Sequence, residues 1–149
     1  MRRYLALVAL LFMSACAANV KPETTVATYG TTVLAAATEL QKGITSATDT
    51  KVIPVATAQK LTAYVEEVYA KSGTLGEGLK AYHAATSVDL RKAKASEIVK
   101  LIADINTATG QILGTSLPSG AVQTINTLVA NVIAAVGAVQ AEVAKGLGS

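Results

Sequence analysis

Two carboxylates, those of Glu97 and Asp104, have a spacing that would suit acid–base chemistry. They lie seven residues apart, which places both on one edge of a helix, as in some catalytic carboxylate pairs. The same two residues flank a heptad pattern of apolar residues, where charged side chains are normally solvated. We therefore predict that Glu97 and Asp104 are solvated surface residues without a catalytic role.

A metal or haem centre would need more ligands than the chain offers. His83 is the only histidine, and Lys80 stands three residues before it, where a di-iron bundle has glutamate. No Cys-x-x-Cys-His motif for covalent haem is present, and both methionines lie within the first 13 residues. The glycines of SGTLGEG, residues 72–78, have neither the Walker spacing nor the dinucleotide-binding spacing. We expect no metal, no cofactor and no enzymatic activity.

The only cysteine of the chain, Cys16, follows an apolar run near the N-terminus. The preceding residues read MRRYLALVALLFMSA, with a charged start, an apolar stretch from Tyr4 to Met13 and small residues before the cysteine. This is the layout of a secretory signal peptide. The apolar stretch is shorter than the roughly 20 residues needed to span a bilayer, so a processed signal is favoured over an uncleaved helical anchor.

The residues from Met13 to Cys16 resemble the lipobox of bacterial lipoprotein precursors, in which an aliphatic residue and two small residues precede a cysteine. The resemblance implies cleavage between Ala15 and Cys16. It also implies a thioether-linked diacylglycerol on Cys16 and acylation of the new amino group, with chains such as palmitate. Each buried methylene contributes about 0.8 kcal/mol, so several acyl chains hold a protein stably at a membrane.

The two residues after the cysteine affect localisation. Inner-membrane lipoproteins of Gram-negative bacteria tend to have aspartate there, whereas this chain has Ala17 and Ala18, so the resemblance favours the outer membrane, facing the periplasm. An alternative remains open because Ala15-Cys16-Ala17 also satisfies the small-x-small rule of ordinary signal peptidase. Cleavage after Ala17 or Ala18 would release a soluble periplasmic protein.

Composition predicts one folded domain. Hydrophobic residues make up 51% of the 149 residues and charged residues 15%, which is too apolar for a disordered chain. Outside the N-terminal Arg2 and Arg3 the basic and acidic residues nearly balance, so no basic surface for nucleic acid is expected. A single cysteine allows no internal disulfide. We predict a signal peptide at residues 1–15, a lipidated tether at residues 16–23 and a helical domain at residues 24–149.

Apolar residues recur at alternating steps of three and four in the first half of this domain, which predicts two helices. The first pattern is Val26, Gly30, Val33, Ala37, Leu40, Ile44 and Ala47. The second pattern is Ala58, Leu61, Val65, Val68, Ser72, Leu75, Leu79 and Tyr82. The threonine-rich TTVATYGTT in the first pattern could alternatively form a strand. The three glycines of residues 72–78 predict a bend or local break in the second helix.

Two further helices follow. Thr86 or Ser87 can cap the third, whose pattern is Ile98, Leu101, Ile105, Ala108 and Ile112. The segment GTSLPSG, residues 114–120, predicts a turn before the fourth helix. The pattern of this last helix is Val122, Ile125, Val129, Val132, Val136, Val139 and Val143. The predicted fold is all-α, an up-down-up-down antiparallel four-helix bundle roughly 40 Å long.

The function expected from these features is that of a lipid-anchored, non-enzymatic envelope lipoprotein, whose bundle serves as a structural or protein-interaction module. Its partners would be the membrane, through Cys16, and an unidentified protein or a second copy of the chain. One alternative is a soluble periplasmic module that holds an apolar ligand between loosely packed, glycine-interrupted helices. Another is a phage-type lysis or pore-forming factor that uses the apolar residues 128–141, although polar residues interrupt any 20-residue window there.

Overall fold

The computed structural model describes the backbone of residues 22–147 and the side chains of residues 28–145. The described chain is all-helical, with four helices and no strand, which confirms the predicted all-α class. These helices are α2 (Pro22–Asp49), α3 (Val55–Ala84), α4 (Val88–Leu113) and α5 (Ser119–Leu147). The predicted signal peptide, Cys16 and most of the predicted tether lie outside the described residues.

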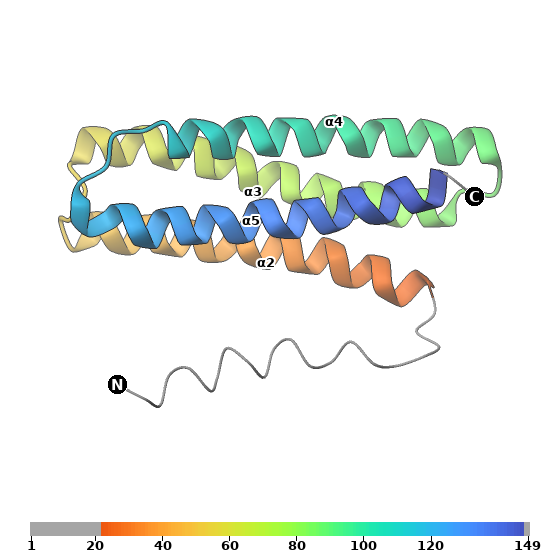
Figure 1. Cartoon of the computed structure of the whole chain (residues 1–149), viewed down its shortest axis with the longest axis horizontal. Helices are drawn as coiled ribbons and strands as arrows, with labels where there is room; N and C mark the ends of the chain where they lie inside the picture. The colour runs from red at the N-terminus through yellow and green to blue at the C-terminus, as the bar shows by residue number, and fades with distance from the viewer. Residues whose placement is uncertain (1–21, 148–149) are drawn as a thin grey trace, which may run out of the picture.

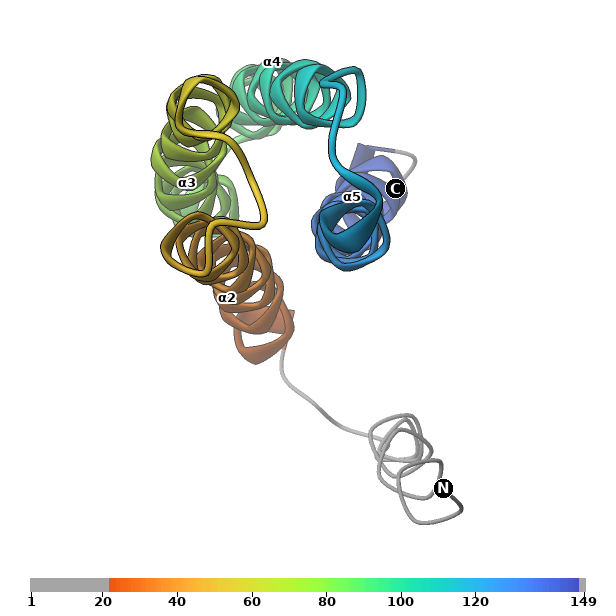
Figure 2. The ribbon, with the colours of Figure 1, turned by 90° about the vertical axis from the view of Figure 1, so that its left-hand side faces the viewer.

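The four helices lie side by side along the long axis of the domain (Figure 1). Helix α3 packs against α2 and α4, and α5 packs against the same two helices from the other side (Figure 2). The contact between α4 and α5 is the least extensive of the four. The apolar stripe of each helix faces the space between them, where one continuous core forms.

Helix α2 forms despite its threonines, which are poor helix formers. Thr32, Thr38 and Thr48 each donate a hydroxyl hydrogen bond of 2.8 Å to the carbonyl oxygen four residues earlier. This bond satisfies the hydroxyl within the helix itself. Burial of Val33 and Leu40 against the other helices supplies the tertiary support that the composition lacks. The described part of the threonine-rich segment is therefore helical and not a strand.

The sequence predicts a bend or a local break near residues 72–78, and no break occurs there. Helix α3 runs without interruption from Val55 to Ala84, and none of the described glycines has a positive φ. Ser72, Leu75 and Leu79 keep their places in the buried stripe on both sides of the glycines. Burial of this stripe outweighs a cost of up to about 1 kcal/mol for each glycine, so the helix stays continuous.

The heptad pattern of α3 agrees with its buried face at every position. Its buried residues are Ala58, Leu61, Val65, Val68, Ser72, Leu75, Leu79 and Tyr82. In α4, Leu101 is only half-buried and Ile102 is buried beside it. In α5, Ala121 and Ala135 are buried and Val122 is half-buried. A straight helix of 3.6 residues per turn drifts relative to a strict heptad, which widens the buried face.

The helix ends agree with the predicted caps and turns to within a few residues. Ser87 is the N-cap of α4, and its hydroxyl accepts a hydrogen bond of 3.2 Å from the backbone N–H of Leu90. Pro54 is the N-cap residue of α3 and makes no side-chain cap hydrogen bond. The turn before α5 is shorter than predicted because this helix already begins at Ser119.

Candidate functional site

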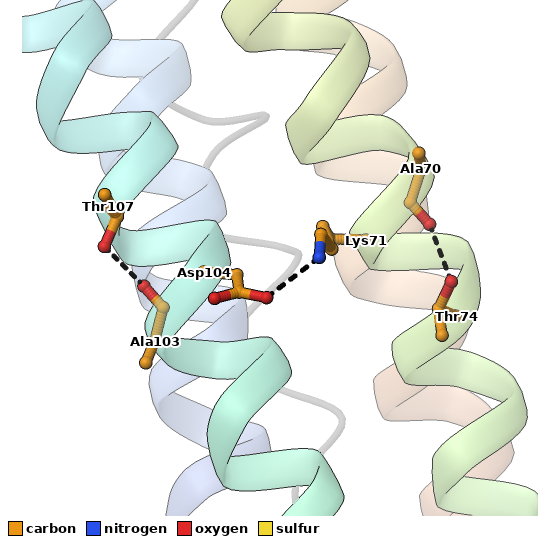
Figure 3. A network of polar contacts seen from close by, with 6 residues as sticks. All are labelled: Ala70, Lys71, Thr74, Ala103, Asp104 and Thr107. Carbon is orange, nitrogen blue, oxygen red and sulfur yellow. Dashed lines mark hydrogen bonds and ion pairs between the residues drawn. The ribbon is translucent and has the colours of Figure 1, made fainter.

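The two predicted surface carboxylates are both paired with lysines. The Asp104 carboxylate on α4 accepts a hydrogen bond of 2.9 Å from Lys71 Nζ on α3, which links two helices (Figure 3). The Glu97 carboxylate is 2.8 Å from Nζ of Lys94 on its own helix. Glu97 and Asp104 thus face different partners, and their side chains are 57% and 47% exposed. The geometry does not join them into one site.

The cross-helix ion pair changes the ionisation of Lys71. The hydrogen bond to Asp104 and its electrostatic attraction raise the pKa of Lys71 above its usual value. The charge of Glu67 raises this pKa further, while partial loss of hydration lowers it. Lys71 is therefore held in its protonated form, which suits a structural cation and not a catalytic base.

His83 is half-buried near the end of α3, where its ring packs edge-to-face against the Tyr82 ring, with 5.3 Å between their centroids. Tyr82 belongs to the core, Tyr64 is half-buried against it, and Tyr69 is 41% exposed. The Tyr82 hydroxyl is buried and has no hydrogen-bond partner. Among the described residues, no group of three or more His, Cys, Asp or Glu side chains is placed to hold a metal ion.

A hollow of about 190 Å³ lies between α2 and α3. Its lining residues are Gly30, Thr31, Leu34, Ser72, Gly73, Gly76, Glu77 and Lys80. The two helices approach closely here, because a Cβ atom built on Gly30 would lie 3.1 Å from the Cα atom of Gly76. Ser72 is fully buried, and its hydroxyl donates a hydrogen bond of 2.6 Å to the Val68 carbonyl oxygen. The sequence predicts a bend or a local break at Gly73 and Gly76 and places Gly30 in the buried stripe of the first helix, but it does not predict that Gly30 and Gly76 meet.

A second depression, between α2 and α5, is a shallow groove of about 390 Å³. Its lining residues are Thr32, Ala35, Ala36, Glu39, Asn131, Ala134 and Ala135. The small side chains of both helices make the groove wide and shallow. Glu39 is its only charged lining residue, and the carboxylate of Glu39 is 2.9 Å from Lys42 Nζ.

The outer side of α5 carries a stripe of exposed, uncharged residues at heptad spacing. The stripe comprises Gly120, Gln123, Thr127, Ala130, Ala134, Gly137, Ala141 and Ala144. No Asp, Glu, Lys or Arg occurs in α5 from Ser119 to Ala141. Among the described helices, α5 alone is long and apolar enough to cross a membrane by length and composition.

Comparison of the chain with protein-family models, with curated proteins and with solved structures found no match. The functional conclusion therefore depends on the residues and their arrangement.

Proposed function

We propose that the protein is a lipid-anchored, non-enzymatic lipoprotein of the cell envelope. Cleavage between Ala15 and Cys16 and acylation of Cys16 would tether it to the outer membrane, on the periplasmic side. The helical domain, an up-down-up-down antiparallel four-helix bundle, would act as a structural or protein-interaction module. The lipobox-like residues Met13 to Cys16 support the anchor.

The lipobox-like residues carry the proposal, and the short distance along the chain between Cys16 and the first helix determines how the domain would lie at the membrane. Helix α2 begins at Pro22, six residues after Cys16. An extended chain spans at most about 3.6 Å per residue, so the start of α2 would stay within roughly 20 Å of the lipidated residue. The α3–α4 connection and the end of α5 lie at the same end of the domain (Figure 1). An anchored bundle would therefore present that end to the membrane.

The outer stripe of α5 supports the interaction role. From Ala130 to Ala144 this stripe consists of Ala and Gly only, so another helix can approach closely there, because no long side chain or like charge keeps the backbones apart. The charged residues of the described helices are concentrated on α3 and α4. The side of the domain formed by α2 and α5 is the better candidate for an apolar protein contact.

Mass spectrometry of the N-terminal peptide of the purified protein tests the anchor. We expect a triacylated Cys16 as the first residue. An unmodified N-terminus at Ala18 or Asn19, the products of cleavage after Ala17 or Ala18, would overturn the proposal in favour of a soluble periplasmic protein.

Membrane fractionation gives a second readout. The wild type should pellet with outer membranes. A Cys16→Ala variant, which cannot be acylated at this position, should not pellet with them. An Ala18→Ser variant keeps both the cysteine and a small residue after it, so it should fractionate like the wild type. Equal amounts of all three proteins in the soluble fraction would contradict lipid anchoring.

The apolar composition of α5 favours one second candidate, a lysis or pore-forming function in which this helix enters the membrane. Overexpression should then dissipate the membrane potential, measured with a potential-sensitive dye. Ala134→Lys would place a charge on the exposed side of α5 and should abolish the effect. The matched control is Ala93→Lys on the exposed side of α4. Unchanged potential on wild-type overexpression would exclude this candidate.

A further inference from the structure

The first turn of α4 exposes two apolar residues at one end of the domain. Val88, the first residue of the helix, is 66% exposed, and Leu90 is 52% exposed. In an α-helix the Cα–Cβ bonds tilt toward the N-terminus, so the side chains of this turn project toward that end of the domain. Apolar side chains that are exposed together, unlike scattered single ones, indicate a contact surface.

Two basic residues follow directly in the chain. Arg91 and Lys92 are exposed, and neither makes an ion pair among the described residues. The lysines nearest to them in the chain, Lys80 and Lys94, are instead bonded to glutamates on their own helices. The acidic residue in this turn is Asp89, which the positive end of the helix dipole stabilises there. Arg91 and Lys92 are therefore available to bind an anion.

The opposite end of the domain exposes apolar residues without this positive charge. Val55 and Leu113 are 71% and 46% exposed there. The α4–α5 connection, residues 114–118, contains no charged residue. In the α2–α3 connection, residues 50–54, Lys51 is the only charged residue, and it lies two positions after Asp49. Within the described residues, exposed apolar side chains and two adjacent unpaired basic ones thus occur together at one end only.

The end that carries Val88 is also the end at which a lipid anchor would hold the domain. Helix α2 begins at this end, and its first residue, Pro22, is six residues from Cys16 (Figure 1). A tethered surface has a high effective concentration at the membrane, so contacts that are weak in a free protein suffice. Basic residues add to acyl chains in binding a membrane.

We propose that this end of the domain docks on the anionic phospholipid surface into which the anchor inserts. Val88 and Leu90 enter the boundary between headgroups and acyl chains, and Arg91 and Lys92 bind lipid phosphates. The inference rests on the proposed lipoprotein function, because the anchor brings this end to the membrane. The bundle then stands on its end, and the α2–α5 side stays available to a protein partner.

The test uses the absence of tryptophan from the chain. Val88→Trp places a fluorescent reporter at the docking end. Val55→Trp is the matched control, because both valines are exposed and each is the first residue of its helix, at opposite ends of the domain. Leu90→Trp serves as a second reporter at the docking end. Each full chain is expressed with its own N-terminal segment, purified, and reconstituted into vesicles of phosphatidylcholine with or without phosphatidylglycerol.

We expect the emission of Val88→Trp and Leu90→Trp to shift to shorter wavelength in vesicles that contain phosphatidylglycerol. Brominated lipids should quench this emission, because the reporter lies at the acyl-chain boundary. The emission of Val55→Trp should stay unshifted and unquenched. Unshifted emission of both docking-end reporters, or equal shifts of all three, would overturn the inference.

Neutralising the basic pair tests the role of charge. Each basic residue at an anionic surface contributes about fivefold to binding, so Arg91→Gln with Lys92→Gln should lower the ratio of docked to undocked domain about 30-fold. The control, Lys60→Gln with Lys100→Gln, removes the same charge from two exposed lysines farther from this end. Salt at about 1 M should also reverse the shift of Val88→Trp, because it screens exposed charges. Equal losses of the shift in both double variants would contradict docking through Arg91 and Lys92.

Mass spectrometry of the same samples separates this inference from the proposed function. A triacylated chain whose docking-end reporters are unshifted would overturn the docking surface and leave the lipoprotein function in place. A chain without acyl groups on Cys16 would overturn the lipoprotein function and the inference with it.

Discussion

Gly30 of α2 and Gly76 of α3 face each other so closely that a methyl group added to Gly30 would lie 3.1 Å from the Cα atom of Gly76. The relationship is not symmetrical, because a methyl group added to Gly76 would meet nothing within 4 Å. Backbone atoms cannot move aside as the end of a side chain can. This close approach of the two helices therefore depends on the missing side chain of Gly30 and not on that of Gly76.

This asymmetry predicts opposite effects of the same substitution. Gly30→Ala should lower the free energy of unfolding, because overpacking costs about 1–3 kcal/mol, more than the helix propensity that alanine adds. Gly76→Ala should raise it by up to about 1 kcal/mol. Urea unfolding followed by circular dichroism measures both. Changes of the same sign in the two variants would refute the described packing.

A second close approach joins α2 to α5, where a Cβ atom on Gly43 would collide with Leu128 Cδ1. The collision involves the end of a flexible side chain, so Gly43→Ala should displace Leu128 without separating the helices. Leu128→Ala removes this obstacle, so the double variant should be more stable than the sum of the single effects predicts, by about 0.5–3 kcal/mol. Leu128→Ala combined with the distant Gly110→Ala serves as the control and should be additive.

Ser87 begins α4 by accepting a hydrogen bond from the Leu90 N–H. Ser87→Ala leaves this N–H without its side-chain partner and should cost about 0.5–2 kcal/mol of stability. Ser87→Asp should retain most of the wild-type stability, because aspartate is an equally good N-cap. Thr86, the other predicted cap, is the residue before the N-cap, and Thr86→Ala should have little effect. Thermal unfolding of the three variants distinguishes these outcomes. A larger loss of stability in Thr86→Ala than in Ser87→Ala would show that Ser87 is not the cap of α4.

The Lys71–Asp104 ion pair predicts a pH dependence of stability in the alkaline range. The pKa of Lys71 is raised in the folded state above its usual value of 10.5. A raised pKa contributes stability that is fully present below the unfolded-state pKa and is lost as pH rises through the folded-state pKa. The Tm difference between the wild type and Lys71→Met should therefore shrink as pH increases above about 10.5.

The control for this ion pair is Lys100→Met, because Lys100 is exposed and makes no ion pair among the described residues. Its Tm difference from the wild type should change less over the same pH range. Salt should weaken the effect of Lys71→Met, since the pair is partly exposed and ions screen its attraction. A Tm difference that is independent of both pH and salt would show that the pair contributes nothing to stability.

Periodicity along the chain predicted the helices and most of their buried positions. Each helix buries one stripe, so the pattern of Val, Leu, Ile and Ala directly records which face is turned inward. The agreement was complete in α3, including Ser72, a polar residue at a core position. It was weaker at Leu101 and Val122, because the buried width of α4 and α5 depends on how the neighbouring helices approach.

The glycines of residues 72–78 do not interrupt helix α3, although the sequence predicts a bend or a local break there. Glycine weakens an isolated helix, and this property alone leads to that prediction. In the folded domain the adjacent residues Leu75 and Leu79 are held in the core, which keeps the helix continuous. The hollow that these glycines leave open arises only when α2 lies against them.

The sequence by itself determined the helical class, most of the buried stripe of each helix and an N-cap at Thr86 or Ser87, because these depend on residues close together in the chain. It also carries the prediction of lipidation at Cys16, which depends on a short segment and not on a fold. Only the tertiary structure decided the Gly30–Gly76 contact, the pairing of Lys71 with Asp104 and the hollow beside Ser72. Each of these joins residues more than 30 positions apart, and their distances are set by the packing of whole helices.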